Sequence, residues 1–136
     1  MNDLVQPPPG GPNSCRLAFG RSAIKFHFMR VESIHSELDR ILSLVGLDPS
    51  VERVYLFGSA ADDERIHEES DIDLCIVQHT DLRFYDRLAE WIDRIRPEIG
   101  LDLVVYTPEE FEQMKKQNYF VRSEIAQKGK EIYHAA

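Results

Sequence analysis

The chain has 136 residues and a mass of 15.8 kDa, which is enough for one domain with a buried core. Hydrophobic residues make up 43% and charged residues 29%, and the formal net charge of −8 argues against duplex DNA or RNA as the main partner, because nucleic-acid binding is dominated by cations. No apolar run is long enough to span a membrane, and the N-terminus lacks the pattern of a signal peptide. Two cysteines, Cys15 and Cys75, form no disulfide or zinc pattern, so we expect a cytoplasmic protein.

Proline and glycine are concentrated at the start of the chain. Four of the seven prolines fall within residues 1–12, and such a composition cannot bury a core. A helical pattern begins directly after Met29. The sequence therefore predicts a disordered N-terminal extension over residues 1–28 and a single folded domain over residues 29–136. The folded part has 13 Lys and Arg against 23 Asp and Glu, a net charge of −10.

From residue 29 onward, helical patterns alternate with short apolar strands. Apolar residues recur at helical spacing from Ile34 to Val45, and Gly46 marks the expected end of this first helix. The other expected elements are, in chain order, a strand at 54–57, a strand at 72–77, a helix at 82–95, a strand at 101–106, a helix beginning at Thr107 and a helical tail at 119–129. This alternation predicts an α/β (α+β) layered fold with its core on a small sheet flanked by helices.

Two aspartates, Asp71 and Asp73, alternate with apolar residues in the second expected strand. Residues two apart on a strand point to the same face, so their carboxylates lie side by side. Such a pair repels and is costly to desolvate, and Mg²⁺, which prefers oxygen ligands, removes that cost. Asp102 lies in the third strand, and if that strand pairs with the second, three carboxylates converge and can hold one or two metal ions.

The first expected strand ends in Gly58 and Ser59 and leads into a helical turn. Glycine lets a phosphate approach closely, free backbone N–H groups favour its charge, and the serine hydroxyl adds a hydrogen bond. A phosphate cradle beside a carboxylate metal site fits a nucleoside triphosphate with Mg²⁺. Taken singly, the Gly-Ser pair also fits an ordinary turn and each aspartate a solvated strand edge, so the inference rests on their combination.

One pattern in the sequence resembles the signature of the DNA polymerase β-like nucleotidyltransferase superfamily. It consists of an apolar strand, Gly58-Ser59, eleven further residues and then Asp71-Ile72-Asp73-Leu74. The Leu-Asp-Leu-Val run around Asp102 resembles the strand that carries the third carboxylate of that family. The small size is similar to that of the minimal nucleotidyltransferases, which often act beside a HEPN-domain protein. The resemblance covers about residues 30–133.

The resemblance implies a mixed sheet flanked by helices, with Gly58 and Ser59 on the triphosphate and Asp71 and Asp73 on Mg²⁺. It implies that Asp102 is the third carboxylate, which helps to activate the acceptor hydroxyl. In the reaction of that family, a hydroxyl attacks the α-phosphate of a nucleotide and pyrophosphate leaves. ATP is the default nucleotide, since no motif for a particular base is present.

The loop between the two motifs departs from the family pattern. Asp62 and Asp63 stand where many minimal members have Arg-Gly, and acids close to a triphosphate weaken its binding unless they turn away. Arg65 can take over the cationic role in binding the nucleotide, although it also fits an ordinary surface arginine.

Only 34 residues follow Asp102, too few for a separate acceptor-binding domain. We therefore expect the acceptor to be held between subunits, in a homo- or hetero-oligomer, or to be supplied by a partner protein. The resemblance suggests a tyrosine of a HEPN-type toxin, with this chain as the antitoxin. Two alternatives are a transferase for a small hydroxylated acceptor such as an aminoglycoside, and a partner-binding module of the same fold without catalysis.

Several aromatic residues lie outside these motifs. Trp91 lies off the main apolar stripe of its helix and is expected either at the rim of the core or, partly exposed, at an interface. Phe111, Tyr119 and Phe120 are expected in the core or at a dimer contact. Cys75, within an apolar strand, is expected to pack as a small hydrophobic residue.

Overall fold

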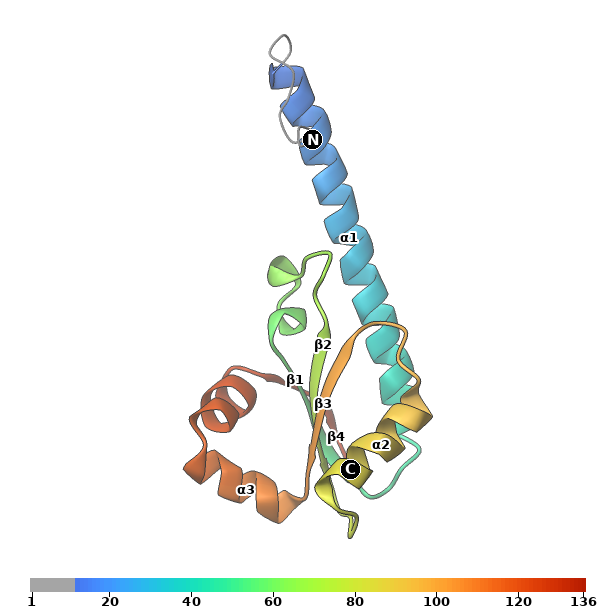
Figure 1. The fold of residues 1–136 in the computed structure, drawn as a ribbon, viewed down its shortest axis with the longest axis vertical. Coiled ribbons are helices and arrows are strands. Elements are labelled where there is room, and N and C mark those ends of the chain that lie inside the picture. Colours follow the sequence, from blue (N-terminus) through green and yellow to red (C-terminus); the bar gives the residue numbers. More distant parts are fainter. Residues whose placement is uncertain (1–11) are drawn as a thin grey trace.

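Four strands form one mixed sheet in the order β3-β2-β1-β4 (Figure 1). The computed structural model describes the backbone of residues 12–136 and the side chains from residue 24 onward. The strands are β1 Val51–Phe57, β2 Ile72–Gln78, β3 Leu101–Tyr106 and β4 Lys130–His134. β2 and β3 are parallel, whereas β1 is antiparallel to both of its neighbours, β2 and β4. The mixed sheet flanked by helices agrees with the expected fold class.

The helical segments are α1 Pro12–Val45, η2 Ser59–Ala61, η3 Asp63–Arg65, α2 Phe84–Ile95, α3 Pro108–Gln117 and the π-helix η4 Val121–Gln127. The helices after β2 lie where the sequence predicts them, whereas α1, which precedes the sheet, begins earlier than the predicted start after Met29. α1 ends as predicted directly before Gly46, whose N–H donates to the Leu42 carbonyl at 2.9 Å. α3 begins with a capping box, in which Thr107 and Glu110 each bind the other's backbone N–H.

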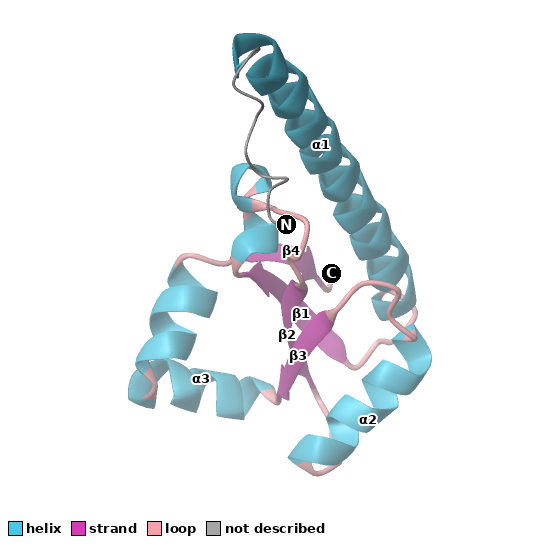
Figure 2. Cartoon of the chain, turned by 45° about the horizontal axis from the view of Figure 1, so that its top comes forward, coloured by secondary structure: helices cyan, strands magenta, loops and turns pink. Residues whose placement is uncertain are grey.

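The two faces of the sheet are covered by different helices (Figure 2). α1 and α2 pack on one face, where the larger core includes Ile41, Leu74 and Trp91. α3 and η4 pack on the other face, where a smaller core forms around Cys75 and Phe111. Cys75 is fully buried, as predicted, and burial raises the pKa of its thiol to about 12. The smaller core covers only part of its face, which leaves room for a site beside it.

Trp91 lies inside the larger core, so the alternative of an exposed interface residue is wrong. Its side chain is fully buried, and its indole Nε1–H donates to Oε1 of the buried Gln78 at 2.9 Å. This partner satisfies the one polar group of the indole, which explains how tryptophan is accommodated off the apolar stripe of α2.

The expected boundary between residues 28 and 29 falls inside α1, which is continuous from Pro12 to Val45. The first eleven residues lie outside the described part of the chain, and the division into an extension and a domain stays a prediction. Two side chains near the boundary bind the body of the protein: His27 Nδ1 donates to the Ile66 carbonyl at 2.9 Å, and Arg30 donates to the Ser70 carbonyl at 2.7 Å. Among the described residues, none of the helices combines the length and the hydropathy needed to cross a membrane.

Candidate active site

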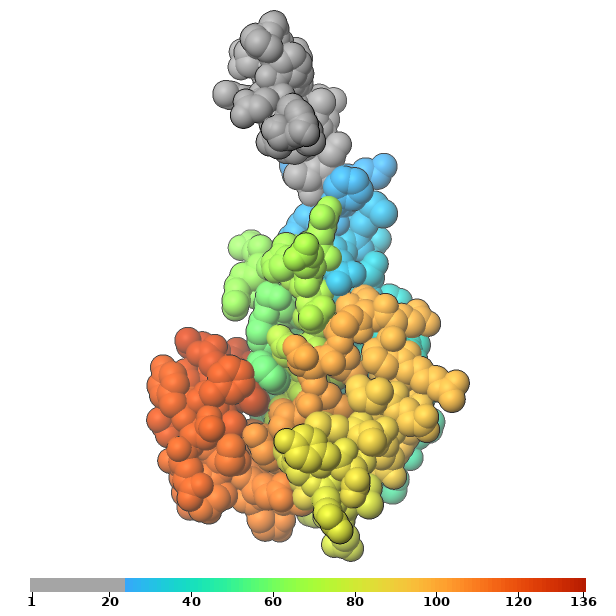
Figure 3. Space-filling view, in the orientation of Figure 1, coloured from blue at the N-terminus to red at the C-terminus, as the bar shows by residue number. Residues whose placement is uncertain are grey.

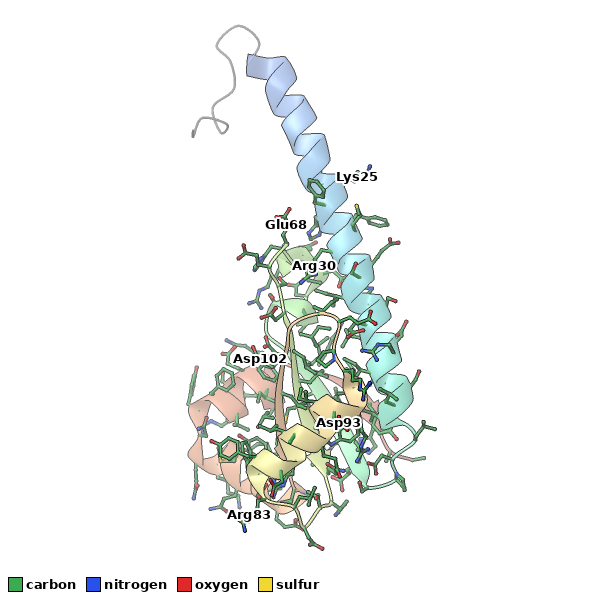
Figure 4. All side chains as sticks on the ribbon, turned by 45° about the vertical axis from the view of Figure 1, so that its right-hand side comes forward. Lys25, Arg30, Glu68, Arg83, Asp93 and Asp102 are labelled. Atoms are coloured by element: carbon green, nitrogen blue, oxygen red, sulfur yellow. The ribbon has the colours of Figure 1, made fainter. Side chains whose placement is uncertain are left out.

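Asp73 and Asp102 face each other across the parallel pair of strands β2 and β3. The strand register pairs their Cα atoms directly, so the condition that brings Asp102 to the face of Asp73 is met. Asp71 precedes the first residue of β2 by one position and is exposed. The structure thus places Asp73 and Asp102 in direct contact, whereas Asp71 lies just before the strand, close enough for its charge to act on Asp73. Figure 4 shows Asp102 on β3, well separated from Asp93 on α2.

The pKa of the Asp73 carboxyl is raised from its ordinary value of 3.8 to about 6. Burial is the largest cause, followed by the hydrogen bond with the Asp102 carboxyl and by the negative charges of Asp102 and Asp71. All four causes disfavour the ionised form, so a positive charge nearby would stabilise the carboxylate. This is the electrostatic behaviour expected of a cation-binding pair.

Two glycines border these carboxylates and leave space for them. Gly58 has φ 73° and ψ −160°, a conformation that side chains rarely tolerate, and a Cβ atom there would overlap Oδ2 of Asp73. A Cβ atom at Gly100 would overlap Oδ1 of Asp71. The sequence predicts a role for Gly58 next to phosphate, but the structure shows that it also makes room for a carboxylate. Gly100 has no signal in the sequence beyond its position before β3.

A cavity of about 510 Å³ opens from the Asp73 and Asp102 pair toward η4. Its walls are mainly apolar and include Phe57, Tyr106 and Phe120, and the rings of Phe57 and Phe120 meet edge to face at 5.7 Å. Further walls come from Gly58, Leu103, Val104, Val121, Glu124 and Ile125. The residues of η4 carry no recognisable motif, so their place in the cavity could not be read from the sequence.

The Gly-Ser turn adjoins the carboxylate pair. Within the described part of the chain, the N–H groups of Ser59 and Ala60 make no backbone hydrogen bond, as is usual for the first residues of a helical turn. The Ser59 hydroxyl donates to Oγ of Ser70 at 3.1 Å, and Ser70 in turn accepts the His67 N–H at 2.8 Å. This chain of bonds ties the turn to the residues just before β2.

The charged residues of the loop are turned to other partners. Asp62 accepts the Glu64 N–H at 3.0 Å, and Asp63 accepts a hydrogen bond from His35 on α1 at 2.9 Å. Neither aspartate lines the cavity, and their effect on triphosphate binding stays a prediction. Arg65 is exposed and does not line the cavity either, so its part in nucleotide binding stays a prediction.

Comparison with known proteins identifies the family of the chain. The sequence model described as "Polymerase beta, Nucleotidyltransferase" matches residues 38–136, more than half of the chain. The chain belongs to this nucleotidyltransferase family. The match contains both motifs and Asp102.

Two solved structures are similar to this nucleotidyltransferase. One is a candidate nucleotidyltransferase from Sulfolobus solfataricus, with 24% identity over 68% of this chain and 79% of the other, and a TM-score of 0.45. The second is a toxin-antitoxin structure with AMP-PNP, with 20% identity over 71% of this chain and 72% of the other, and a TM-score of 0.41. No curated protein matches the chain.

The family implies a divalent metal ion, and the donor groups of this nucleotidyltransferase fit one. Asp73 and Asp102 supply adjacent carboxylate oxygens, which are ligands that Mg²⁺ prefers, and a cation would offset the repulsion that raises the pKa of Asp73. Across residues 24–136, no three His, Cys, Asp or Glu side chains form a metal-binding group by themselves. Substrate phosphate and water oxygens would therefore complete the coordination, as is usual for Mg²⁺.

Proposed function

We propose that this chain is a Mg²⁺-dependent nucleotidyltransferase that transfers a nucleoside monophosphate, AMP from ATP, to a hydroxyl group. The observation that carries the proposal is the Asp73 and Asp102 pair, held in contact at one end of an apolar cavity and next to the Gly-Ser turn. In the reaction, a bond forms between the acceptor oxygen and the α-phosphorus. The bond from the α-phosphorus to the bridging oxygen breaks, and pyrophosphate leaves.

Each group has a role in this proposal. Asp71, Asp73 and Asp102, together with substrate phosphate and water oxygens, would hold Mg²⁺, which would neutralise charge on the phosphates. The carboxylate of Asp102 accepts the proton of the attacking hydroxyl. The N–H groups that follow Gly58 bind the triphosphate, and Arg65 adds a positive charge near it.

We further propose that the acceptor is a tyrosine of a HEPN-type toxin and that the transfer silences the toxin. Support comes from the elements after β3, which pack on the sheet or join its edge next to the site. Tyr119 and Phe120, at the start of the segment that borders the cavity, are both exposed. Exposed aromatic residues beside a reaction site suit contact with a protein substrate.

The test is the transfer of label from α-labelled ATP, in the presence of Mg²⁺, in a lysate that contains the neighbouring gene products. Asp73→Asn and Asp102→Asn should each abolish labelling. Asp93→Asn is the matched control, because this exposed aspartate lies on α2, away from the site. Labelling of a single helical protein on tyrosine supports the proposal.

Other outcomes separate the alternatives. Label in a small molecule indicates a transferase with a small hydroxylated acceptor. A folded chain that binds its partner yet transfers no label from any nucleoside triphosphate is a binding module without catalysis, and this result would refute the proposed activity.

A further inference from the structure

The first part of α1 differs in charge from the rest of the protein. Residues 12–31, which we call the arm, contain four Lys or Arg and no Asp or Glu, a net charge of +4. Residues 32–136, the body, contain 12 Lys or Arg and 23 Asp or Glu, a net charge of −11. The two parts of one molecule are therefore electrostatically complementary.

The arm also exposes large apolar side chains. Ile24, Phe26, Phe28 and Met29 are each between 50% and 70% exposed. Ile24 and Phe28 lie one turn apart on one side of α1, whereas Phe26 lies on the opposite side, so the exposed apolar side chains are not confined to one face of the helix. Exposed apolar side chains of this size commonly mark a contact with a partner. Figure 1 shows the start of α1 running beyond the sheet, and Figure 3 shows residues from 24 onward of the arm adjoining the loop before β2, to which His27 and Arg30 bind.

An apolar groove lies at the other end of the molecule, between α2 and α3. Its volume is about 430 Å³, and its floor is formed by Phe84, Tyr106 and Met114. Glu109 and Glu110 stand on its rim. Glu110 already pairs with Arg87, whereas Glu109 is exposed and its carboxylate has no partner among the described residues. The groove thus combines an apolar floor with unneutralised negative charge.

We infer that the arm of one copy of this chain docks into the groove between α2 and α3 of a second copy. The apolar side chains of the arm fit the apolar floor, and Lys25 fits the acidic rim. Because the arm and the groove lie at opposite ends of the molecule, the arm cannot reach its own groove (Figure 1). Two copies placed head to tail about a two-fold axis exchange arms, and the assembly closes as a dimer.

Other partners for the arm fit the structure less well. Pairing of two arms brings together two segments of charge +4, which repel each other. Binding to a lipid surface requires one apolar and one polar face, whereas the apolar residues of the arm are spread around the helix.

The first test is the mass of the full chain in solution, measured by sedimentation equilibrium at low and at physiological salt. We expect twice the chain mass of 15.8 kDa, with weaker association as salt rises. Phe28→Glu in the arm and Met114→Glu in the groove should each halve the mass. Leu47→Glu is the matched control, since Leu47 is 80% exposed but lies outside both surfaces, and it should leave the dimer intact. A wild-type chain that is monomeric would overturn the inference.

Mixing the two variants identifies the contact. Phe28→Glu retains an intact groove and Met114→Glu retains an intact arm, so the mixture should form a heterodimer through one arm and one groove. Arm-to-arm pairing predicts no recovery on mixing and no effect of Met114→Glu, and either result would overturn the assignment. Circular dichroism of each variant must match the wild type, which separates loss of contact from loss of fold. Binding of the monomer to anionic vesicles would assign the arm to a membrane surface instead.

Discussion

Gly58→Ala is the substitution that tests the geometry of the site most directly. Gly58 has φ 73° and ψ −160°, and an added Cβ atom would lie 3.2 Å from Cγ of Asp73 and overlap its Oδ2 atom. The variant must therefore either change its backbone at the end of β1 or move the Asp73 carboxylate away from Asp102. Both changes damage the arrangement that we propose holds the metal and the triphosphate.

The expected loss of stability follows from two opposing effects. A non-glycine residue in this backbone region costs about 1–3 kcal/mol. Replacing glycine by alanine also restricts the unfolded chain, which stabilises the fold by about 0.4–1 kcal/mol. We therefore expect Gly58→Ala to lower the free energy of unfolding by about 1–2 kcal/mol, and to reduce nucleotidyl transfer more than this loss of stability explains.

Urea denaturation and label transfer measure the two effects separately. Gly46→Ala is the matched control, because a Cβ atom at Gly46 makes only an ordinary contact of 3.4 Å with the Leu42 carbonyl. We expect this variant to stay within about 1 kcal/mol of the wild type and to remain fully active. If Gly58→Ala proves as stable and as active as Gly46→Ala, then neither the strained backbone nor the contact with Asp73 has the importance assigned to it.

Two further predictions concern buried polar groups. The pKa of Asp73 is raised from 3.8 to about 6, so the folded, metal-free chain binds this proton more tightly than the unfolded chain does, and its stability falls as pH rises through that interval. We place this fall in the free energy of unfolding at about 1–2 kcal/mol after allowing for solvent screening, and Asp73→Asn should remove it. Urea unfolding of the wild type and the variant across this pH range measures the fall. A variant with the same pH profile as the wild type would contradict the raised pKa of Asp73. Trp91→Phe leaves the buried Oε1 of Gln78 without its hydrogen-bond donor. We expect the free energy of unfolding, measured by thermal or urea denaturation, to fall by about 1–3 kcal/mol. A loss below about 0.5 kcal/mol would show that another group donates to Gln78.

The local elements of this protein were determined by short-range patterns in its sequence. The predicted strand at 101–106 coincides with β3, and the end of α1 at Gly46 and the cap at Thr107 are also where the residue types predict them. These features depend on neighbouring residues, namely on side-chain period and on capping hydrogen bonds. The prediction that Asp71 and Asp73 share one face depends on the same local geometry, although β2 begins only at Ile72.

Only the tertiary structure decided which of these groups meet. The contact between Asp73 and Asp102 requires β3 to pair in parallel with β2, and strand order depends on packing between distant segments rather than on local pattern. The same packing brings Phe120 and Glu124 of the last helical segment to the cavity and buries Trp91 against Gln78. The sequence alone therefore determined the candidate chemical groups, whereas long-range packing determined their distances, their burial and the raised pKa of Asp73.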